Sequence, residues 1–546
     1  FSMLLSPVTM ASMSRVLLRR GPAAHIGGYT RRSLGSHVTL RAEQGQSKSM
    51  TSALKAFMAA AGGFLMRSRS SLSHRPLNSQ ELPMVVQELK KQDFLLKVGP
   101  LKPSGLIVDS EGQMHEFGQD SEFETYDLQV LLAGDSNHPF FFSPLRVRLR
   151  FGIGNSVRNE GLPEIRLGGQ LAFPLVSRDR QPPKVFWDTF KASAANENSE
   201  VAVTELLRSL RHFLLDPADY LGLEIGDGSP EARRLQTWCR DVTRLNGQRL
   251  EVIKKYMPQA RHPDLFDPVL PLKKEWFHEK IWSFLNGGTE DWQDVLTEHV
   301  PGVYSFPLFK DEFCDTLLEE IFNFYDTGLP ARRPNSMNNY GIILSDIGLE
   351  PFIDKLQELL QPLGAGFFPG PGNSWDGHHC FIVRYREGED LGLDMHTDDS
   401  DVTFNICLGL DFAGAGLQFC GTVGTAEHRK HNFTYAHKKG HCIVHLGRQR
   451  HGADDITSGE RLNLILWNHS SEFRSSLEYQ RPAYSPEESA PDPVCLSYTH
   501  DRDFGTFKEY PKGKELFRGR GWCPPSHAEY PDFQAEIAGS SRKSSL

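Results

Sequence analysis

Residues 391–410, LGLDMHTDDSDVTFNICLGL, restrict the fold of this chain more than any other segment. Apolar and other residues alternate in its second half, and such alternation predicts a β-strand with one buried face. The apolar face carries Val402, Phe404, Ile406, Leu408 and Leu410, and the opposite face carries Thr403, Asn405, Cys407 and Gly409. The segment is therefore expected to form one wall of a barrel or sandwich.

His396 and Asp398 stand just before this strand. Side chains two residues apart in an extended segment point the same way, so the imidazole and the carboxylate are expected on one side. A bare His-x-Asp is weak evidence, because a second copy occurs at His262-Pro263-Asp264 without a strand pattern behind it. The first copy is distinguished by the strands that follow it.

Three more strand patterns complete this region. GAGLQF (residues 414–419) predicts a turn and a strand, and GHCIVHLGRQRHGA (440–453) predicts a third strand ending near His451. A turn at residues 457–459 is expected to return the chain as the strand ERLNLILW (460–467). Arg461 then lies on the strand adjacent to His451.

The order of these residues indicates a metal site with a carboxylate-binding group beside it. Two imidazoles and one carboxylate on one face of an iron ion leave three open positions, which suit a chelating co-substrate and dioxygen. A guanidinium nearby can pair with a distal carboxylate in bidentate fashion. The expected co-substrate is a short diacid with an α-keto acid head, which describes 2-oxoglutarate. A lone strand His or Arg is more often a packing or surface residue, so the hypothesis depends on the joint order.

Residues 300–472 resemble the iron(II)- and 2-oxoglutarate-dependent dioxygenases of the prolyl/lysyl hydroxylase branch. The resemblance is carried by Tyr385-x-x-Gly388 before His396-x-Asp398, by DSDVTFNICLGL, by the HKKG turn and by HLGRQRH. RRPNSMNNYGIIL (332–344) is similar to the 2-oxoglutarate- and iron-dependent oxygenase domain-containing proteins. The match covers about a third of the chain.

The resemblance implies a double-stranded β-helix, or jelly roll, with flanking helices. It implies iron ligands at His396, Asp398 and His451, with Arg461 on the 5-carboxylate of 2-oxoglutarate. Tyr385 and Asn405 are candidate co-substrate contacts, although a packing role for the Tyr and a satisfied core amide for the Asn are the alternatives. His445 is expected to support the ligands or to be structural. PNSMNNYG (334–341) is expected either to line the substrate mouth or to form a turn-rich loop.

The implied activity is hydroxylation of a prolyl or lysyl side chain of a protein, coupled to decarboxylation of 2-oxoglutarate to succinate, with O₂ as the oxidant. L-ascorbate is expected to keep the iron reduced. One alternative is a non-catalytic adaptor that combines an oxygenase-like fold with a binding domain. Another is a metal-dependent cupin that uses no 2-oxoglutarate, which Arg461 disfavours.

Residues 81–220 are expected to form a smaller α+β domain. FETYDLQVLLAG and PLRVRLRFGI predict strands, and VAVTELLRSLRHFLLDP predicts an amphipathic helix. The segment resembles the ubiquitin-conjugating (E2-like) fold through Pro139-Phe140, Pro144-x-x-Val147, Trp187 and the helix ending in LLDP. No Cys occurs before Cys239, so an E2 thioester cysteine is absent. The resemblance implies a catalytically inert binding module with a possible ubiquitin-pathway partner; an unrelated α+β domain is the alternative.

The expected organisation is multidomain, of the α+β class. Residues 1–80 are a basic, transit-like or disordered segment, 221–300 a helical linker, 301–472 the dioxygenase domain and 473–546 a loop-rich tail. Asp311 is expected to cap a helix whose apolar face begins at Phe313.

Charge and cysteine usage limit the partners and the compartment. Residues 1–80 contain 11 Lys and Arg residues and one acid, Glu43, so the remainder of this chain of net charge −9 is strongly acidic. That charge argues against a nucleic-acid partner. No apolar run is long enough for a membrane span, and the eight Cys residues, none in a C-x-x-C pair, predict reduced thiols. An intracellular soluble protein, organellar if the N-terminus is a transit peptide and otherwise cytoplasmic, is expected.

Overall fold

The computed structural model describes residues 81–480, except for 109–110, 117–124, 135–143, 153–161, 169–180, 183, 194–198, most of 223–246, 289–291 and 423–431. The expectations for residues 1–80 and for most of the tail therefore lie outside the described residues.

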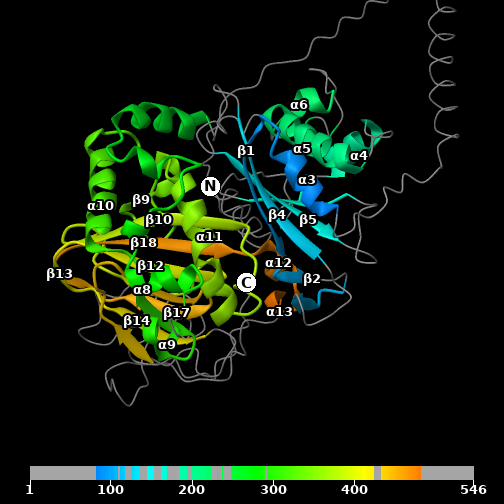
Figure 1. Cartoon of the computed structure of the whole chain (residues 1–546). Coiled ribbons are helices and arrows are strands. Elements are labelled where there is room, and N and C mark those ends of the chain that lie inside the picture. The colour runs from blue at the N-terminus through cyan, green and yellow to red at the C-terminus, as the bar shows by residue number, and fades with distance from the viewer. Residues whose placement is uncertain are drawn as a thin grey trace, which may run out of the picture. The chain divides into compact units, whose positions relative to one another are not determined.

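The C-terminal half contains two antiparallel sheets (Figure 1). The path of the major sheet is β7 (Thr297–Val300), β8 (Val303–Pro307), β16 (His441–Leu446), β12 (Val402–Gly409), β18 (Ile456–His469), β10 (Gly377–Arg386) and β9 (Gly341–Ile343), and β13 (Phe412–Gly414) pairs with β18. The minor sheet is β11 (Leu393–His396), β17 (Gln449–Ala453), β14 (Leu417–Thr422) and β15 (Phe433–Tyr435). This pair of sheets fits the expected jelly roll.

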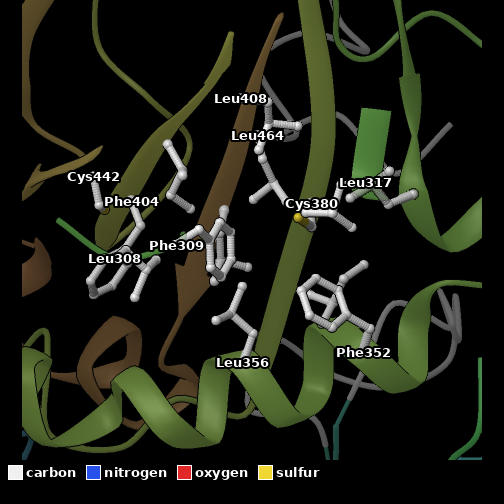
Figure 2. Close-up of a cluster of buried hydrophobic side chains, with 14 of the residues drawn as sticks. Leu308, Phe309, Leu317, Phe352, Leu356, Cys380, Phe404, Leu408, Cys442 and Leu464 are labelled. Carbon is white, nitrogen blue, oxygen red and sulfur yellow. The ribbon is translucent and has the colours of Figure 1, made fainter. Parts of the chain in front are cut away.

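Two long helices cover one face of the major sheet. They are α10 (Asp311–Asp326) and α11 (Glu350–Phe367), and their apolar sides join the main hydrophobic core. Figure 2 shows Phe352 and Leu356 of α11 pointing toward Cys380 on β10 and Leu464 on β18. The opposite face of the major sheet shares a second core with the minor sheet, which includes Phe381, Leu417 and Trp467.

The alternation that predicted β12 is confirmed over most of the strand. Val402, Phe404, Ile406 and Leu408 are buried in the core that the helices cover. Leu410 is the exception, because it is 42% exposed. The strand ends at Gly409, whose φ of +107° interrupts the alternation before Leu410.

Three local predictions are wrong. Residues 440–453 form two strands, β16 and β17, because the chain turns at Gly447 and Arg448. The return turn lies at 454–455, since β18 already begins at Ile456 and continues through 457–459 beside β13. Asp311 is the first residue of α10, and the N-cap is the extended residue Lys310, which makes no side-chain capping bond.

The N-terminal sheet has the order β1 (Leu95–Pro103), β4 (Thr125–Leu132), β5 (Leu145–Gly152) and β6 (Glu164–Leu167), with a separate hairpin of β2 (Leu106–Val108) and β3 (Met114–Glu116). Its helices are α3 (Leu82–Leu89), α4 (Lys184–Ser193), α5 (Ser199–Leu215) and α6 (Pro217–Tyr220). The predicted strands and the predicted helix are confirmed as β4, β5 and α5, and the apolar side of α5 is buried against the sheet.

Buried arginines occupy the other face of this sheet. Arg146, Arg148 and Arg150 alternate along β5, and Arg166 on β6 is the cross-strand partner of Arg148. Arg148 Nη2 is 3.1 Å from Asp376, and Arg150 Nη1 is 2.8 Å from Glu472. Asp376 directly precedes β10 and Glu472 follows β18, so carboxylates of the C-terminal half neutralise arginines on this face of the N-terminal sheet.

Residues 250–300 differ from the expected linker. This segment contains the helices α8 (Glu279–Leu285) and α9 (Trp292–Val295), and its strand β7 belongs to the major sheet. Four of its side chains are buried in the main core: Tyr256, Leu265, Phe277 and Ile281. This part of the chain supports the sandwich directly.

In the part of the chain that the structure describes, no helix is long and apolar enough to cross a membrane. The described cysteines, Cys314, Cys380, Cys407, Cys420 and Cys442, are all buried and free of disulfides.

Candidate active site

The site lies between the two sheets and is built on a direct pairing of β11 with β17. His396 and His451 are register partners across these strands, and Asp398 follows two residues after β11 ends. The nitrogen and oxygen atoms that these three residues offer all lie within 4.8 Å of one another. His396 Nε2 is 3.4 Å from Asp398 Oδ1, and His451 Nε2 is 3.5 Å from Asp398 Oδ2.

Hydrogen bonds orient the Asp398 and His451 side chains. Thr403 Oγ1 donates to Asp398 Oδ2 over 2.7 Å, and His451 Nδ1 lies 2.9 Å from the carbonyl oxygen of Gln449. A carbonyl can only accept, so Nδ1 carries the proton and the lone pair of Nε2 faces Asp398. The arrangement presents imidazole nitrogens and a carboxylate in the form that a divalent transition metal requires.

Gly447 allows the turn that carries Asp398 to approach β16. A Cβ at Gly447 would lie 1.8 Å from the carbonyl oxygen of Ser400, which no side chain permits. The Asp398 N–H donates to the Gly447 carbonyl over 2.9 Å, and the Gly447 N–H donates to the Asp401 carbonyl over 3.1 Å. The close approach of Ser400 thus explains why a glycine stands at position 447 of the HLGRQRH segment.

The electrostatics of the cluster favour a bound cation. Burial opposes ionisation of Asp398, but the neighbouring His451 and His396 imidazoles hold the pKa of its carboxyl well below its usual range. Burial lowers the pKa of His451 to about 3. The carboxylate is therefore ionised and the His451 imidazole is neutral at physiological pH, as metal ligation requires.

Arg461 lies in the same pocket and is 1% exposed. Its guanidinium carbon is 4.8 Å from the centre of the Tyr385 ring, and Nη1 donates to the Ala415 carbonyl. Among the described residues Nε has no hydrogen-bond partner and no carboxylate pairs with this guanidinium. Burial lowers the pKa of Arg461, as expected for a cation without an acid partner.

Tyr385 and Asn405 also line the pocket. Tyr385 is the register partner of Arg461 across β10 and β18. Asn463 Nδ2 donates to Asn405 Oδ1 over 2.6 Å, so the Nδ2 group of Asn405 is left as a donor for the pocket. The expected parity of Thr403 and Asn405 is confirmed, since both side chains line this space.

The structure places the remaining candidates as follows. His445 is fully buried, and its ring centre is 4.4 Å from that of His451. Asn335, Met337 and Asn338 of the PNSMNNYG segment line the pocket. The control pair is separated, because His262 contacts Glu319 and Asp264 contacts Lys273 at the surface.

Two residues that the sequence did not single out lie at or beside this pocket. Trp467 lines it with a buried indole N–H that has no acceptor among the described residues, and Asn463, beside the pocket, fixes the Asn405 amide. Both lie at alternate positions of β18 from Arg461, so strand parity was the signal that pointed to them.

A second group of possible ligand atoms, from Glu350, Asp354 and His378, has its charge balanced within the protein. Arg249 pairs with Glu350, and Arg146 Nη1 lies 3.6 Å from Asp354. Guanidinium groups at these carboxylates disfavour a metal ion there.

The chain is similar to known proteins over this region. The OGFOD2-like domain model matches residues 252–373. The 2-oxoglutarate and iron-dependent oxygenase domain-containing protein ICU11 of Arabidopsis thaliana is 34% identical over 288 residues, covering 51% of this chain and 70% of that protein. The human 2-oxoglutarate and iron-dependent oxygenase domain-containing protein 2 is 40% identical over 178 residues, which cover 32% of this chain and 51% of that relative.

More distant matches have hydroxylase names. The human multifunctional procollagen lysine hydroxylase and glycosyltransferase LH3 is 27% identical over 37% of this chain and 28% of its own length. A solved prolyl-4-hydroxylase of Pseudomonas putida aligns with 31% of this chain and 88% of its own, at 16% identity and a TM-score of 0.23. The identity to ICU11 and the share of that protein that is covered carry the assignment: the chain belongs to the family of 2-oxoglutarate and iron-dependent oxygenase domain-containing proteins.

Proposed function

We propose that this chain is an Fe(II)- and 2-oxoglutarate-dependent dioxygenase that hydroxylates a prolyl or lysyl side chain of a protein or peptide. The observation that carries the proposal is Arg461, a buried guanidinium without a carboxylate partner among the described residues, in the pocket of His396, Asp398 and His451. Leaving such a cation unpaired is costly unless an anionic ligand occupies the pocket.

In this proposal His396, Asp398 and His451 hold the iron, and Arg461 binds the 5-carboxylate of 2-oxoglutarate. The iron supplies activation of dioxygen and oxidative decarboxylation of the co-substrate to succinate and CO₂, with L-ascorbate as the expected reductant. Thr403 keeps the Asp398 carboxylate turned toward the two imidazoles, over 2.7 Å. The Asn405 Nδ2 group and the Tyr385 hydroxyl are further donors toward the co-substrate.

The walls of the pocket separate the reaction from water. Phe381, Leu417, Ile465 and Trp467 are buried and line it, and Asn335 and Met337 lie at its loop side. Low polarity strengthens the ion pair expected between Arg461 and a carboxylate, and it protects a reactive oxidant from side reactions.

The test is equilibrium binding of 2-oxoglutarate to the Mn(II)-loaded protein by titration calorimetry. We expect the wild type to bind and Arg461→Met to bind at least tenfold more weakly, because the carboxylate loses its guanidinium. Arg386→Met is the control, since Arg386 is exposed, pairs with Glu389 and does not line the pocket. Equal binding by Arg461→Met and the wild type would contradict the assignment of Arg461.

An E2-like role for residues 81–220, with a ubiquitin-pathway partner, remains a prediction. The order of α3, four antiparallel strands and then α4 to α6 is compatible with it. The adaptor alternative is distinguished by the binding experiment, since an adaptor has no need to retain 2-oxoglutarate.

A further inference from the structure

The loop of residues 334–340 lines the pocket through Asn335, Met337 and Asn338 and is held at both ends. At its start the Pro334 carbonyl lies 2.9 Å from His379 Nε2. At its end the Asp390 carboxylate accepts the N–H groups of Asn339, over 2.7 Å, and Tyr340, over 3.2 Å. These bonds fix the position of the residues between, of which Asn338 is 1% exposed.

Within the loop, hydrogen bonds determine which way the Asn338 amide faces. Asn335 Oδ1 accepts the N–H groups of Met337 and Asn338, over 2.8 and 2.7 Å. The Asn335 Nδ2 group is then its donor, and it donates to Asn338 Oδ1 over 3.1 Å. The Nδ2 group of Asn338 must therefore be the one that lies 3.2 Å from the Tyr385 hydroxyl.

This contact decides where the Tyr385 proton can go. The hydroxyl oxygen accepts from Asn338, so its own O–H has to donate to another group. No acceptor for it occurs among the described residues, and Tyr385 is only 3% exposed. The pocket that holds Arg461 is the remaining direction, and the guanidinium stacks on the same ring at 4.8 Å.

We propose that Asn338 is a positioning residue for co-substrate binding. Its amide holds the Tyr385 hydroxyl as an acceptor on one side, so that the phenolic O–H donates to the 2-oxoglutarate carboxylate that Arg461 binds. The inference rests on the proposed function and adds a residue of the loop to it. It also couples the loop that lines the pocket to retention of the co-substrate.

The experiment is a double-mutant cycle on 2-oxoglutarate affinity, measured by calorimetry with the Mn(II)-loaded full chain. Asn338→Ala and Tyr385→Phe are each expected to weaken binding about tenfold, the effect of one hydrogen bond to a charged group. Because Asn338 acts through the phenol, adding Asn338→Ala to Tyr385→Phe should weaken binding no further. A second tenfold loss in the double variant would overturn the proposal.

Asn338→Asp separates this role from a general effect on the loop. It keeps the size of the side chain and the acceptor for Asn335, but it replaces the donor with a carboxylate that accepts the Tyr385 proton. We expect weaker 2-oxoglutarate binding than in Asn338→Ala, because the new carboxylate takes the proton that the co-substrate would accept; the melting temperature, measured beside it, shows that the variant is folded. Ser336→Ala, at an exposed residue of the same loop, should bind as the wild type does.

The outcomes distinguish this inference from the function beneath it. Wild-type affinity in both Asn338 variants, with a wild type that binds 2-oxoglutarate, would overturn the positioning role alone. A wild type that binds no 2-oxoglutarate would overturn the proposed function and this inference with it.

Discussion

Thr403 is the residue whose effect on the candidate metal site can be isolated most cleanly. Its hydroxyl donates to Asp398 Oδ2 over 2.7 Å, and a valine would keep its shape. We expect Thr403→Val to weaken Mn(II) affinity by about 10-fold or more, since bonds to ligand carboxylates typically contribute that much. Competition with a metal chelator measures this. Thr316→Val, whose hydroxyl bonds its own helix, should have no effect.

Asp401 gives the site region a pH dependence. Burial raises the pKa of its carboxyl to about 6, despite the bonds from Arg474 and from the Ser470 N–H. A carboxyl with a raised folded-state pKa stabilises the fold at low pH, and this contribution is lost as the pH rises from about 4 to 6. The two-unit shift corresponds to about 3 kcal/mol.

The Asp401 effect is measured by urea unfolding of the wild type and Asp401→Asn between pH 4 and 7. The free energy of unfolding of the wild type should fall relative to that of Asp401→Asn over this range. A difference that stays constant with pH would show that Asp401 does not titrate there.

The turn between β16 and β17 depends on Gly447. An alanine Cβ would meet the Ser400 carbonyl oxygen at 1.8 Å and push the Asp398 turn away. We expect Gly447→Ala to lower the free energy of unfolding by about 3 kcal/mol and to weaken metal binding. Gly366→Ala is the matched control. Gly366 lies in α11, and a Cβ there would meet no atom of a neighbouring element within 4 Å. Alanine should therefore raise the free energy of unfolding by about 0.5–1 kcal/mol. Equal melting temperatures for the two variants would contradict this account.

Strand alternation explains why β4, β5 and β12 were predictable and why other elements were not. In β12 the two faces differ in polarity: the apolar face packs in the main hydrophobic core, and Thr403 and Asn405 of the opposite face line the pocket. The boundary between β16 and β17 was missed because HLGRQRH contains no strong turn sequence; the break depends on a close approach of Ser400. The Asn338 amide was unpredictable because its partner, Tyr385, lies 47 residues away.

The arginine face of the N-terminal sheet could not be read from sequence for the same reason. Alternating Arg residues on a strand resemble a solvent face, and the acid partners are distant: Asp376 lies 228 residues from Arg148. The strands of the sandwich were predictable, whereas the long-range ion pairs that join β5 and β6 to residues near β10 and β18 were not.

At the scale of the whole molecule, Glu472 is the central residue of these contacts. Its carboxylate accepts from Arg150 at 2.8 Å and from the Val108 N–H at 2.6 Å, and Arg166 Nη2 forms an ion pair with it at 2.6 Å. We expect Glu472→Gln to lower the free energy of unfolding by about 3 kcal/mol, because Arg150 and Arg166 each lose one carboxylate partner and keep only Asp127 and Glu164, respectively. Glu88→Gln, which breaks an exposed pair with Lys91, should change it by less than about 1 kcal/mol. A similar small change in both would show that the buried contacts add no stability.

The central claim is that His396, Asp398 and His451 hold an iron that consumes 2-oxoglutarate. The most direct measurement is succinate release by the full chain with Fe(II), 2-oxoglutarate, L-ascorbate and air, beside His451→Ala, without a protein substrate. The account predicts slow succinate release by the wild type and at least 100-fold less by His451→Ala, because one of its three ligands is lost. Equal release by the two proteins, or none by a wild type that is loaded with iron, would contradict it.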